Sequence, residues 1–319
     1  MSYLITERHG RVLTVKLNNP PYNFLNAPMV KELQTLLRSL KGDDTVGAVI
    51  VTSAVDGIFI SHYDVDEIVS VSERMGIRSG PRMAAAGLRW AAVAERVPGV
   101  RRLLERSPAE GLVTIRRLHD VTRRMRTLDK VFIAAINGRA YGGGCEFALA
   151  CDIRLIADGE LEEGYGIGQP EVLVGLIPGG GGTQMLPRSV GMARALEIML
   201  EGRQLSPREA VDIGLVTGAV APAELMDEAR SAAERLARRP AASVAAIKHA
   251  VYKGATARLE SGLHIERANM LSVCSMPASQ QAMRLYLEEI RRYEQLGDTL
   301  LTPDKMEPWR EGHAIDLVS

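Results

Sequence analysis

Two glutamates, each close to a run of glycines, are the residues of this sequence best suited to chemistry. Glu146 stands just after the glycines 142–144, and Glu171 follows Pro170 and precedes a second glycine run, residues 179–182. Adjacent glycines let the backbone approach a ligand closely, because they adopt dihedral angles that are closed to other residues. Two carboxylates beside such loops can accept and donate protons, so the sequence predicts an acid/base pair.

The elements around the first glycine run must position Glu146. Residues 131–136 are apolar and predict a strand, and residues 145–150 predict a helix. The N–H groups in the first turn of a helix have no partner within that helix, so they would point at a ligand lying over the glycines. Such a corner is suited to a developing oxyanion, with Glu146 projecting from the same turn.

Cys145, next to Glu146, is a second candidate for chemistry. The surrounding motif contains no histidine that could activate the thiol as a nucleophile. Small buried cysteines are common in protein cores. We therefore expect Cys145 to be structural.

Length and charge limit the class of protein. A chain of 319 residues can bury a large core, and its formal net charge of zero favours neither nucleic acid nor a membrane surface as partner. No apolar run is long enough to span a bilayer, and the N-terminus enters a strand-like pattern without the plan of a signal peptide. We expect a cytoplasmic protein with reduced thiols at Cys145, Cys151 and Cys274.

Other catalytic motifs do not occur in the sequence. The glycine runs lack the lysine and spacing of a phosphate-binding loop and the G-x-G-x-x-G pattern of dinucleotide sites. No cluster of histidines, cysteines and acids has metal-ligand spacing, and no G-x-S-x-G elbow occurs. We expect neither a metal nor a nicotinamide cofactor.

The periodicity of the N-terminal part predicts an α/β fold. Residues 3–17 alternate as a β-hairpin, a helix opens at Pro28, and residues 46–52 form an apolar run typical of a buried strand. Strands and helices continue to alternate along the chain, which indicates parallel strands joined by crossovers.

Several motifs together resemble one known family. Residues 137–158, NGRAYGGGCEFALACDIRLIAD, resemble the signature of the crotonase superfamily, specifically the enoyl-CoA hydratase/isomerase family. Residues 168–184, GQPEVLVGLIPGGGGTQ, are similar to the second signature of that family. The likeness extends upstream to residues 17–26 and 58–68 and downstream through residues 200–220.

The resemblance implies a fold and a division of the chain. Residues 1–220 would form the crotonase spiral, in which repeated ββα turns build two stacked sheets surrounded by helices. An arginine-rich helical insertion would interrupt the spiral at about residues 69–116. Residues 221–319 would form a C-terminal helical region and tail, and in the family such helices build a trimer. A homotrimer or homohexamer is therefore expected.

Smaller elements of the C-terminal third are also predicted. Residues 213–216 resemble the closing strand of the family. Helices are expected at residues 225–236, 241–252 and about 280–293, and residues 303–319 are expected to be an extended tail.

The resemblance further implies hydration of a trans-2-enoyl-CoA to a 3-hydroxyacyl-CoA. Glu146 would act as base on a water molecule, and Glu171 would deliver a proton to the α-carbon. The backbone N–H groups of Tyr63 and Gly143 would hold the thioester oxygen. Double-bond isomerisation, another acyl-CoA reaction such as hydrolysis, and a non-catalytic acyl-CoA-binding scaffold remain alternatives.

The acyl-CoA thioester is the expected partner, with no cofactor beyond its own coenzyme A. By resemblance, CoA would lie along the loops at Phe24, Leu25, Ile60 and Ser61, with Gly142 beside the substrate. His62 stands where the family commonly has glycine, and we expect its side chain to turn to solvent or to the acyl pocket. Asp64 is expected to hold the loop turn.

The insertion has three open interpretations. It could be a solvated helical segment at a subunit contact, a lid over the acyl pocket that uses Trp90 and Met83, or a site for anionic phosphates. Residues 83–93 and 100–104 within it predict helices.

Overall fold

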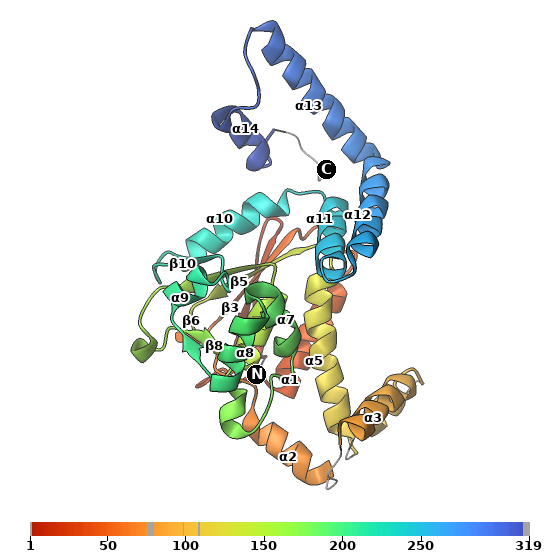
Figure 1. The fold of residues 1–319 in the computed structure, drawn as a ribbon, viewed down its shortest axis with the longest axis vertical. Coiled ribbons are helices and arrows are strands. Elements are labelled where there is room, and N and C mark those ends of the chain that lie inside the picture. The colour runs from red at the N-terminus through yellow and green to blue at the C-terminus, as the bar shows by residue number, and fades with distance from the viewer. Residues whose placement is uncertain (1, 76–79, 98, 108, 315–319) are drawn as a thin grey trace.

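The structure is a computed structural model that describes residues 2–75, 80–97, 99–107 and 109–314 (Figure 1). Parts of the predicted insertion and the end of the predicted tail lie outside the described residues. Two sheets and the helices around them make up the body of the molecule, which agrees with the predicted α/β class.

The larger sheet has six strands in the order β1-β2-β3-β5-β7-β10. β1 and β2 pair antiparallel as the predicted hairpin, and the four following pairings are parallel. The strands are β1 (Leu4–His9), β2 (Val12–Leu17), β3 (Ala48–Ser53), β5 (Val131–Ile136), β7 (Ile153–Ala157) and β10 (Gly218–Val220).

The smaller sheet has four strands in the order β4-β6-β8-β9. Its strands are β4 (Gly57–Ile60), β6 (Gly138–Tyr141), β8 (Ile167–Gly168) and β9 (Gln204–Leu205). The first three run parallel and β9 pairs antiparallel with β8. β6 leads into the first glycine run and β8 leads into the segment that carries Glu171, so this sheet sets the relative position of the two signatures.

Both faces of the larger sheet are covered, which explains its near-continuous apolar strands. Val49 and Val51 of β3 point into a core shared with the smaller sheet and with α1, α5 and α6. Their neighbours Ala48 and Ile50 point to the opposite face, where α10 covers them. The helices of the body are α1 (Ala27–Ser39), α5 (Glu110–Thr127), α6 (Gly143–Ala150), α7 (Gly182–Val190), α8 (Met192–Glu201), α9 (Pro207–Asp212), α10 (Leu225–Ala237) and α11 (Ala241–His249).

The prediction of a closing strand at residues 213–216 is wrong, because β10 begins only at Gly218. Gly214 adopts a left-handed conformation (φ 74°) just after α9. The N–H groups of Leu215 and Val216 then both donate to the carbonyl of Ala210, and both side chains are buried. These amides are therefore used to end α9 and not to pair with a strand.

The insertion is helical, as predicted. α2 (Val65–Met75), α3 (Pro81–Ala94) and α4 (Val100–Leu104) precede α5. An ion pair between Arg116 and Glu95 (3.3 Å) joins α5 to the end of α3, and Arg117 pairs with Glu105. Figure 1 shows α2 and α3 at the end of the molecule opposite to α13.

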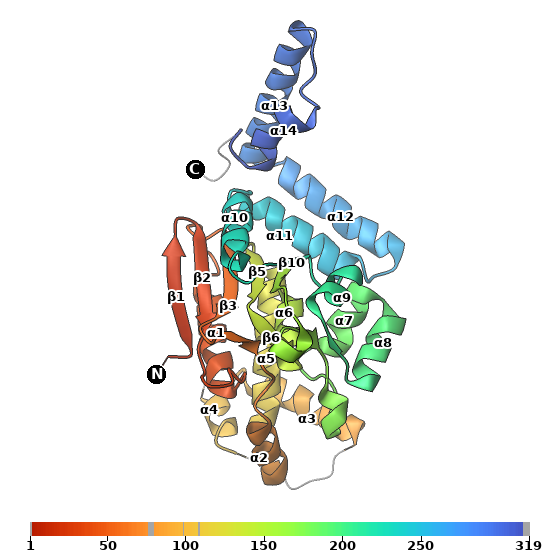
Figure 2. The ribbon, with the colours of Figure 1, turned by 90° about the vertical axis from the view of Figure 1, so that its left-hand side faces the viewer.

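Of the last three helices, α12 packs along α11, and α13 and α14 extend away from the body (Figure 2). The three helices are α12 (Leu259–Cys274), which was not predicted, α13 (Pro277–Gln295) and α14 (Pro303–Arg310). The expectation of an extended tail from residue 303 is therefore wrong for residues 303–310. Proline at the first turn favours this helix, and Trp309 packs edge-on against Tyr286 of α13 with ring centroids 5.1 Å apart.

Candidate functional site

The first glycine run forms a tight corner between β6 and α6. Gly142 has a φ of 51°, and its N–H donates to the carbonyl of Gly168 at 2.9 Å. α6 begins at the next residue. A Cβ atom on Gly144 would lie 2.3 Å from the carbonyl oxygen of Ile60. The corner therefore requires glycine both for its backbone angles and for the close approach of β4.

The carboxylate of Glu146 is buried, with 4% of the residue exposed. Its Oε1 accepts hydrogen bonds from the N–H groups of Gly180 and Gly182, each at 2.7 Å. Burial raises the pKa of Glu146, and the two amides oppose that rise because they stabilise the charged form. The second glycine run thus holds the glutamate that the first run presents.

Glu171 opens a short 3-10 helix, η2 (Glu171–Val174), and lies across the corner from Glu146. An ideal Cβ on Gly142 would be 3.1 Å from Oε1 of Glu171. Burial, and secondarily the charge of Glu146, raises the pKa of Glu171 to about 7. Glu171 can therefore be protonated under conditions in which an ordinary carboxyl group is ionised.

Gln169 touches Glu171 and is fully buried. When the side-chain amide of Gln169 is oriented with its nitrogen toward Glu171, the nitrogen donates to the two carboxylate oxygens at 2.9 and 3.1 Å. We assign this orientation because it satisfies both side chains. Sequence reasoning gave Gln169 no role, although it stands two residues before Glu171 in the second signature.

A short bridge between two loops presents the amide of Tyr63. The N–H of Leu25 donates to the carbonyl of His62 (3.0 Å), and the N–H of Asp64 donates to the carbonyl of Leu25 (2.8 Å). The Tyr63 nitrogen lies 3.2 Å from the position of a Cβ on Gly143. Within the described part of the chain, neither the N–H of Tyr63 nor the N–H of Gly143 donates to a protein acceptor. Gly143 is the first residue of α6, where N–H groups lack partners within the helix.

The side chain of Tyr63 fixes its loop from the other side. Its hydroxyl donates to Oε2 of Glu67 at 2.9 Å, and the same oxygen accepts the N–H of Ala27 at 2.9 Å. Burial raises the pKa values of Tyr63 and Glu67. Asp64 accepts the N–H of Asp66 at 3.0 Å, the turn-holding role that was expected. Glu67 is a second residue that sequence reasoning missed.

A cavity of about 920 Å³ opens in front of these groups. The groups at its chemical end are Tyr63, Gly142, Gly143, Glu146 and Glu171. The insertion supplies Ser70, Val71, Ser72, Arg74 and Leu88 to its wall. Met83 and Trp90, which are about half exposed, are not among its lining residues, so the insertion reaches the cavity through other side chains than those expected.

The four residues predicted to hold CoA do not line this cavity. Leu25 and Ile60 are fully buried behind the corner. Ser61 is also buried, and its hydroxyl has no hydrogen-bond partner among the described residues. Phe24 packs against His62 with the rings tilted and their centroids 4.5 Å apart, and His62 itself lines the cavity.

Other chemistry finds little support in the described residues. Cys145 is buried, and burial raises the pKa of its thiol, as expected for a structural cysteine. No group of three or more histidines, cysteines and acids in the described ranges could hold a metal ion. In the same ranges, no helix combines the length and apolar character needed to cross a membrane.

Comparison with known proteins places these motifs in a family. The family profile described as enoyl-CoA hydratase/isomerase matches residues 7–81 and 100–295. The short-chain-enoyl-CoA hydratase of Clostridium acetobutylicum is 30% identical to this chain over 91% of this chain and 96% of its own length. A probable enoyl-CoA hydratase of Rhizobium meliloti is 33% identical over 90% of this chain and 96% of its own length.

Solved structures show the same fold. An enoyl-CoA hydratase from Bacillus anthracis matches with a TM-score of 0.71 at 26% identity, over 90% of this chain and 96% of the other. A probable enoyl-CoA hydratase/isomerase from Mycobacterium abscessus also has a TM-score of 0.71, at 27% identity, over 90% and 97% of the two chains. On this evidence the chain has the crotonase fold and belongs to the enoyl-CoA hydratase/isomerase family.

Proposed function

We propose that this chain adds water to a trans-2-enoyl-CoA and releases a 3-hydroxyacyl-CoA. The observation that carries the proposal is the placement of two carboxyl groups, Glu146 and Glu171, on one cavity with two backbone amides that have no protein acceptor in the described chain. Double-bond isomerisation moves one proton and needs one carboxylate, whereas hydration needs both a base and an acid. Relatives named as hydratases support the same reaction.

In the proposed reaction Glu146 takes a proton from water while the water oxygen bonds to the β-carbon. The electrons of the double bond move toward the thioester oxygen, which accepts hydrogen bonds from the N–H groups of Tyr63 and Gly143. Glu171, protonated at the start, then delivers its proton to the α-carbon. CoA remains part of the substrate and product, so the reaction uses no separate cofactor. We place CoA along the loops that carry Phe24, Leu25, Ile60 and Ser61, beside Gly142.

Replacing each glutamate by glutamine tests the pair. Glu146→Gln and Glu171→Gln should each lower kcat for hydration of crotonyl-CoA by at least about a hundredfold, because each removes a proton-transfer group. The double variant should lose little beyond the worse single variant, since the two groups act as a unit. Loss of the conjugated thioester absorbance measures the rate, and calorimetry with a CoA thioester verifies that binding is retained.

Two outcomes would change the assignment. Normal turnover by Glu171→Gln with an inactive Glu146→Gln would favour a one-carboxylate reaction. Tight binding of enoyl-CoA thioesters by the wild type without turnover of any of them would favour a binding scaffold.

The raised pKa of Glu171 predicts how hydration depends on pH. Because Glu171 must start protonated, kcat/KM should fall as pH rises through about 7, where Glu171 loses its proton. The residual activity of Glu171→Gln should lack this decline, since the amide does not titrate. Initial rates between about pH 5.5 and 9 measure the profile. A wild-type kcat/KM that is flat or rising over this interval would remove Glu171 as the acid.

Tyr63 is proposed to act through its backbone N–H. Tyr63→Phe should therefore keep most of the activity, although it loses the hydrogen bond to Glu67. Tyr63→Pro, which deletes the N–H, should lower kcat on the order of a thousandfold. Steady-state kinetics of both variants, with thermal melting as a control for folding, decide the point. A thousandfold loss in Tyr63→Phe would mean that the hydroxyl takes part.

We propose that the insertion forms the far wall of the acyl pocket. The family profile passes over residues 82–99, so nearly all of α3 lies outside it. Leu88 in α3 and Val71 in α2 line the same cavity as the two glutamates. Leu173, Val174 and Ile177 on the opposite side are largely exposed apolar side chains on the cavity. A long apolar acyl chain would cover them.

Shortening the pocket from its far wall tests this role. Leu88→Trp should raise KM for dodecenoyl-CoA about tenfold and leave KM for crotonyl-CoA nearly unchanged, because only the long chain reaches the wall. Val93→Trp is the matched control, since Val93 lies in the same helix but is 62% exposed and outside the cavity lining. Equal effects of Leu88→Trp on both substrates would contradict the proposal.

We propose a homotrimer or a dimer of trimers in solution. The support is the amount of apolar surface left uncovered on one chain: Met192, Leu196 and Leu200 of α8 form an exposed face, as do Leu259, Met270 and Leu271 of α12. A mass of one chain by light scattering would contradict it.

A further inference from the structure

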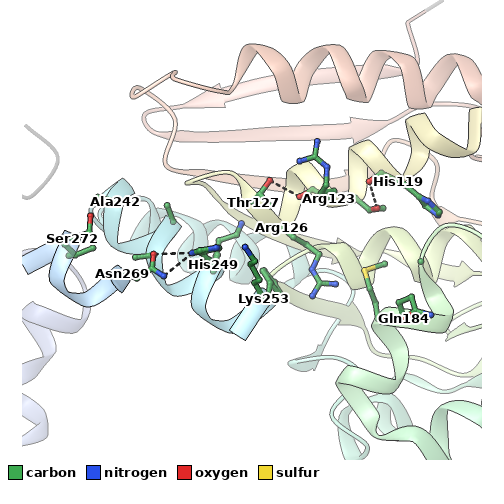
Figure 3. Close-up of a pocket in the computed structure, with 18 of the residues that line it drawn as sticks. His119, Arg123, Arg126, Thr127, Gln184, Ala242, His249, Lys253, Asn269 and Ser272 are labelled. Atoms are coloured by element: carbon green, nitrogen blue, oxygen red, sulfur yellow. Dashed lines mark hydrogen bonds between the residues drawn. The ribbon is translucent and has the colours of Figure 1, made fainter. Parts of the chain in front are cut away.

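A second cavity of about 760 Å³ is lined in part by the glycine loop that holds Glu146. Figure 3 shows side chains that line this cavity. Its walls come from the C-terminal half of α5, the start of α7, α11, the π-helical turn η3 (Ala250–Gly254), and α12. Gly180 lines both this cavity and the one described above, and His119 contacts the carbonyl of Gly179 at 2.7 Å. The two cavities therefore share one backbone segment in their walls.

The lining of this second cavity is basic, although the chain as a whole is neutral. Apart from Tyr252, its titratable side chains are cationic or imidazole groups: His119, Arg123, Arg126, Lys248, His249 and Lys253. No aspartate or glutamate stands among its described lining residues.

Two of the cations have carboxylate partners. Lys248 bonds to Asp152 at 2.8 Å and to the backbone carbonyls of Met125 and Lys130. Arg123 bonds to Asp120. The other carboxylate oxygen of Asp152 accepts the hydroxyl of Tyr252 at 2.7 Å, so Asp152 is fully engaged.

Arg126 and Lys253 have no carboxylate partner in the part of the chain that the structure describes. The guanidinium of Arg126 lies over the ring of Tyr252, 4.1 Å from its centroid, and burial lowers the pKa of this arginine. Figure 3 shows Arg126 from α5 and Lys253 from η3 extending into the same space. Lys253 is exposed to solvent, whereas Arg126 is partly buried, and the charge of Asp152 partly opposes the lowering of its pKa. Two cationic side chains without an ion pair among the described residues thus face one partly enclosed space, where they can take up an anion.

We propose that this cavity binds a small phosphate ester or diphosphate, with Arg126 and Lys253 as its main ligands. A guanidinium and an ammonium match the charge and the acceptor geometry of phosphate oxygens. Thr127, Gln184 and Ser272 line the same space and add polar groups around it. The volume suits a small organic molecule. The proposal does not rest on the hydratase reaction.

Calorimetric titration with pyrophosphate tests the site directly. Wild-type protein at fixed ionic strength should bind one pyrophosphate per chain, and Arg126→Met and Lys253→Met should each weaken binding about tenfold, since each removes a charged hydrogen-bonding partner. Arg126→Lys should recover part of the affinity because it keeps the charge. Lys41→Met is the matched control, because Lys41 is an exposed lysine at the end of α1 and outside the cavity.

The phosphate groups could belong to a separate ligand or to the CoA of the substrate, and kinetics distinguishes these sources. An increase of KM in Arg126→Met for crotonyl-CoA, but not for crotonyl-pantetheine, would assign the site to the phosphates of CoA. An unchanged KM for both, together with weakened pyrophosphate binding, would assign it to a separate phosphorylated ligand.

Three results would overturn the proposal. The first is absence of pyrophosphate binding to the wild type. The second is equal weakening in Lys41→Met, which would mean unspecific attraction. The third is an unchanged affinity for pyrophosphate in both Arg126→Met and Lys253→Met, which would place the bound pyrophosphate elsewhere. Thermal melting of each variant verifies that the fold is intact.

Discussion

The burial of the Glu146 carboxylate is the constraint on which the site depends. A carboxylate removed from water costs several kcal/mol unless other groups compensate it. Here the compensation comes from two backbone amides, at Gly180 and Gly182, that belong to the second glycine run. A Cβ on Gly180 would lie 2.6 Å from Oε2 of Glu146, so a residue with a side chain could not approach so closely without a shift. The two glycine runs are therefore parts of one structure.

The same arrangement makes the two glutamates chemically different. Glu146 receives two amide hydrogen bonds, which favour its charged form. Glu171 sits against Gln169, and burial next to another carboxylate favours its neutral form. Burial raises the pKa of both groups, and the amides of the second glycine run oppose that rise at Glu146, which suits Glu146 to the role of base and Glu171 to that of acid. The difference arises from backbone placement and not from the type of side chain.

The oxyanion corner and the insertion are linked through α2. Glu67 in α2 bonds both to the hydroxyl of Tyr63 and to the N–H of Ala27 at the start of α1. The helices that extend the cavity thus begin on the loop that presents the Tyr63 amide. A change in the length of the insertion can alter the far wall of the cavity while β4 and α6 keep the chemical end unchanged.

The sequence by itself determined the features that depend on local pattern. The hairpin, β5, α6 and the helices of the insertion followed from periodicity, and the family followed from the motifs around Glu146 and Glu171. Local pattern failed where distant contacts decide the conformation: residues 213–216 turn into the core, and residues 303–310 form a helix that packs on α13.

Only the tertiary structure decided which distant residues meet. The amides on Glu146 come from residues 34 and 36 positions away, and the contact of Tyr63 with Gly143 joins two different loops. The packing of α3 on α5 decides which side chains of the insertion reach the cavity: Leu88 does, and Trp90 does not. The meeting of Arg126 and Lys253 on one cavity was equally invisible in the sequence. Charge balance is a property of neighbours in space, and a neutral chain can still concentrate one sign of charge in a single cavity.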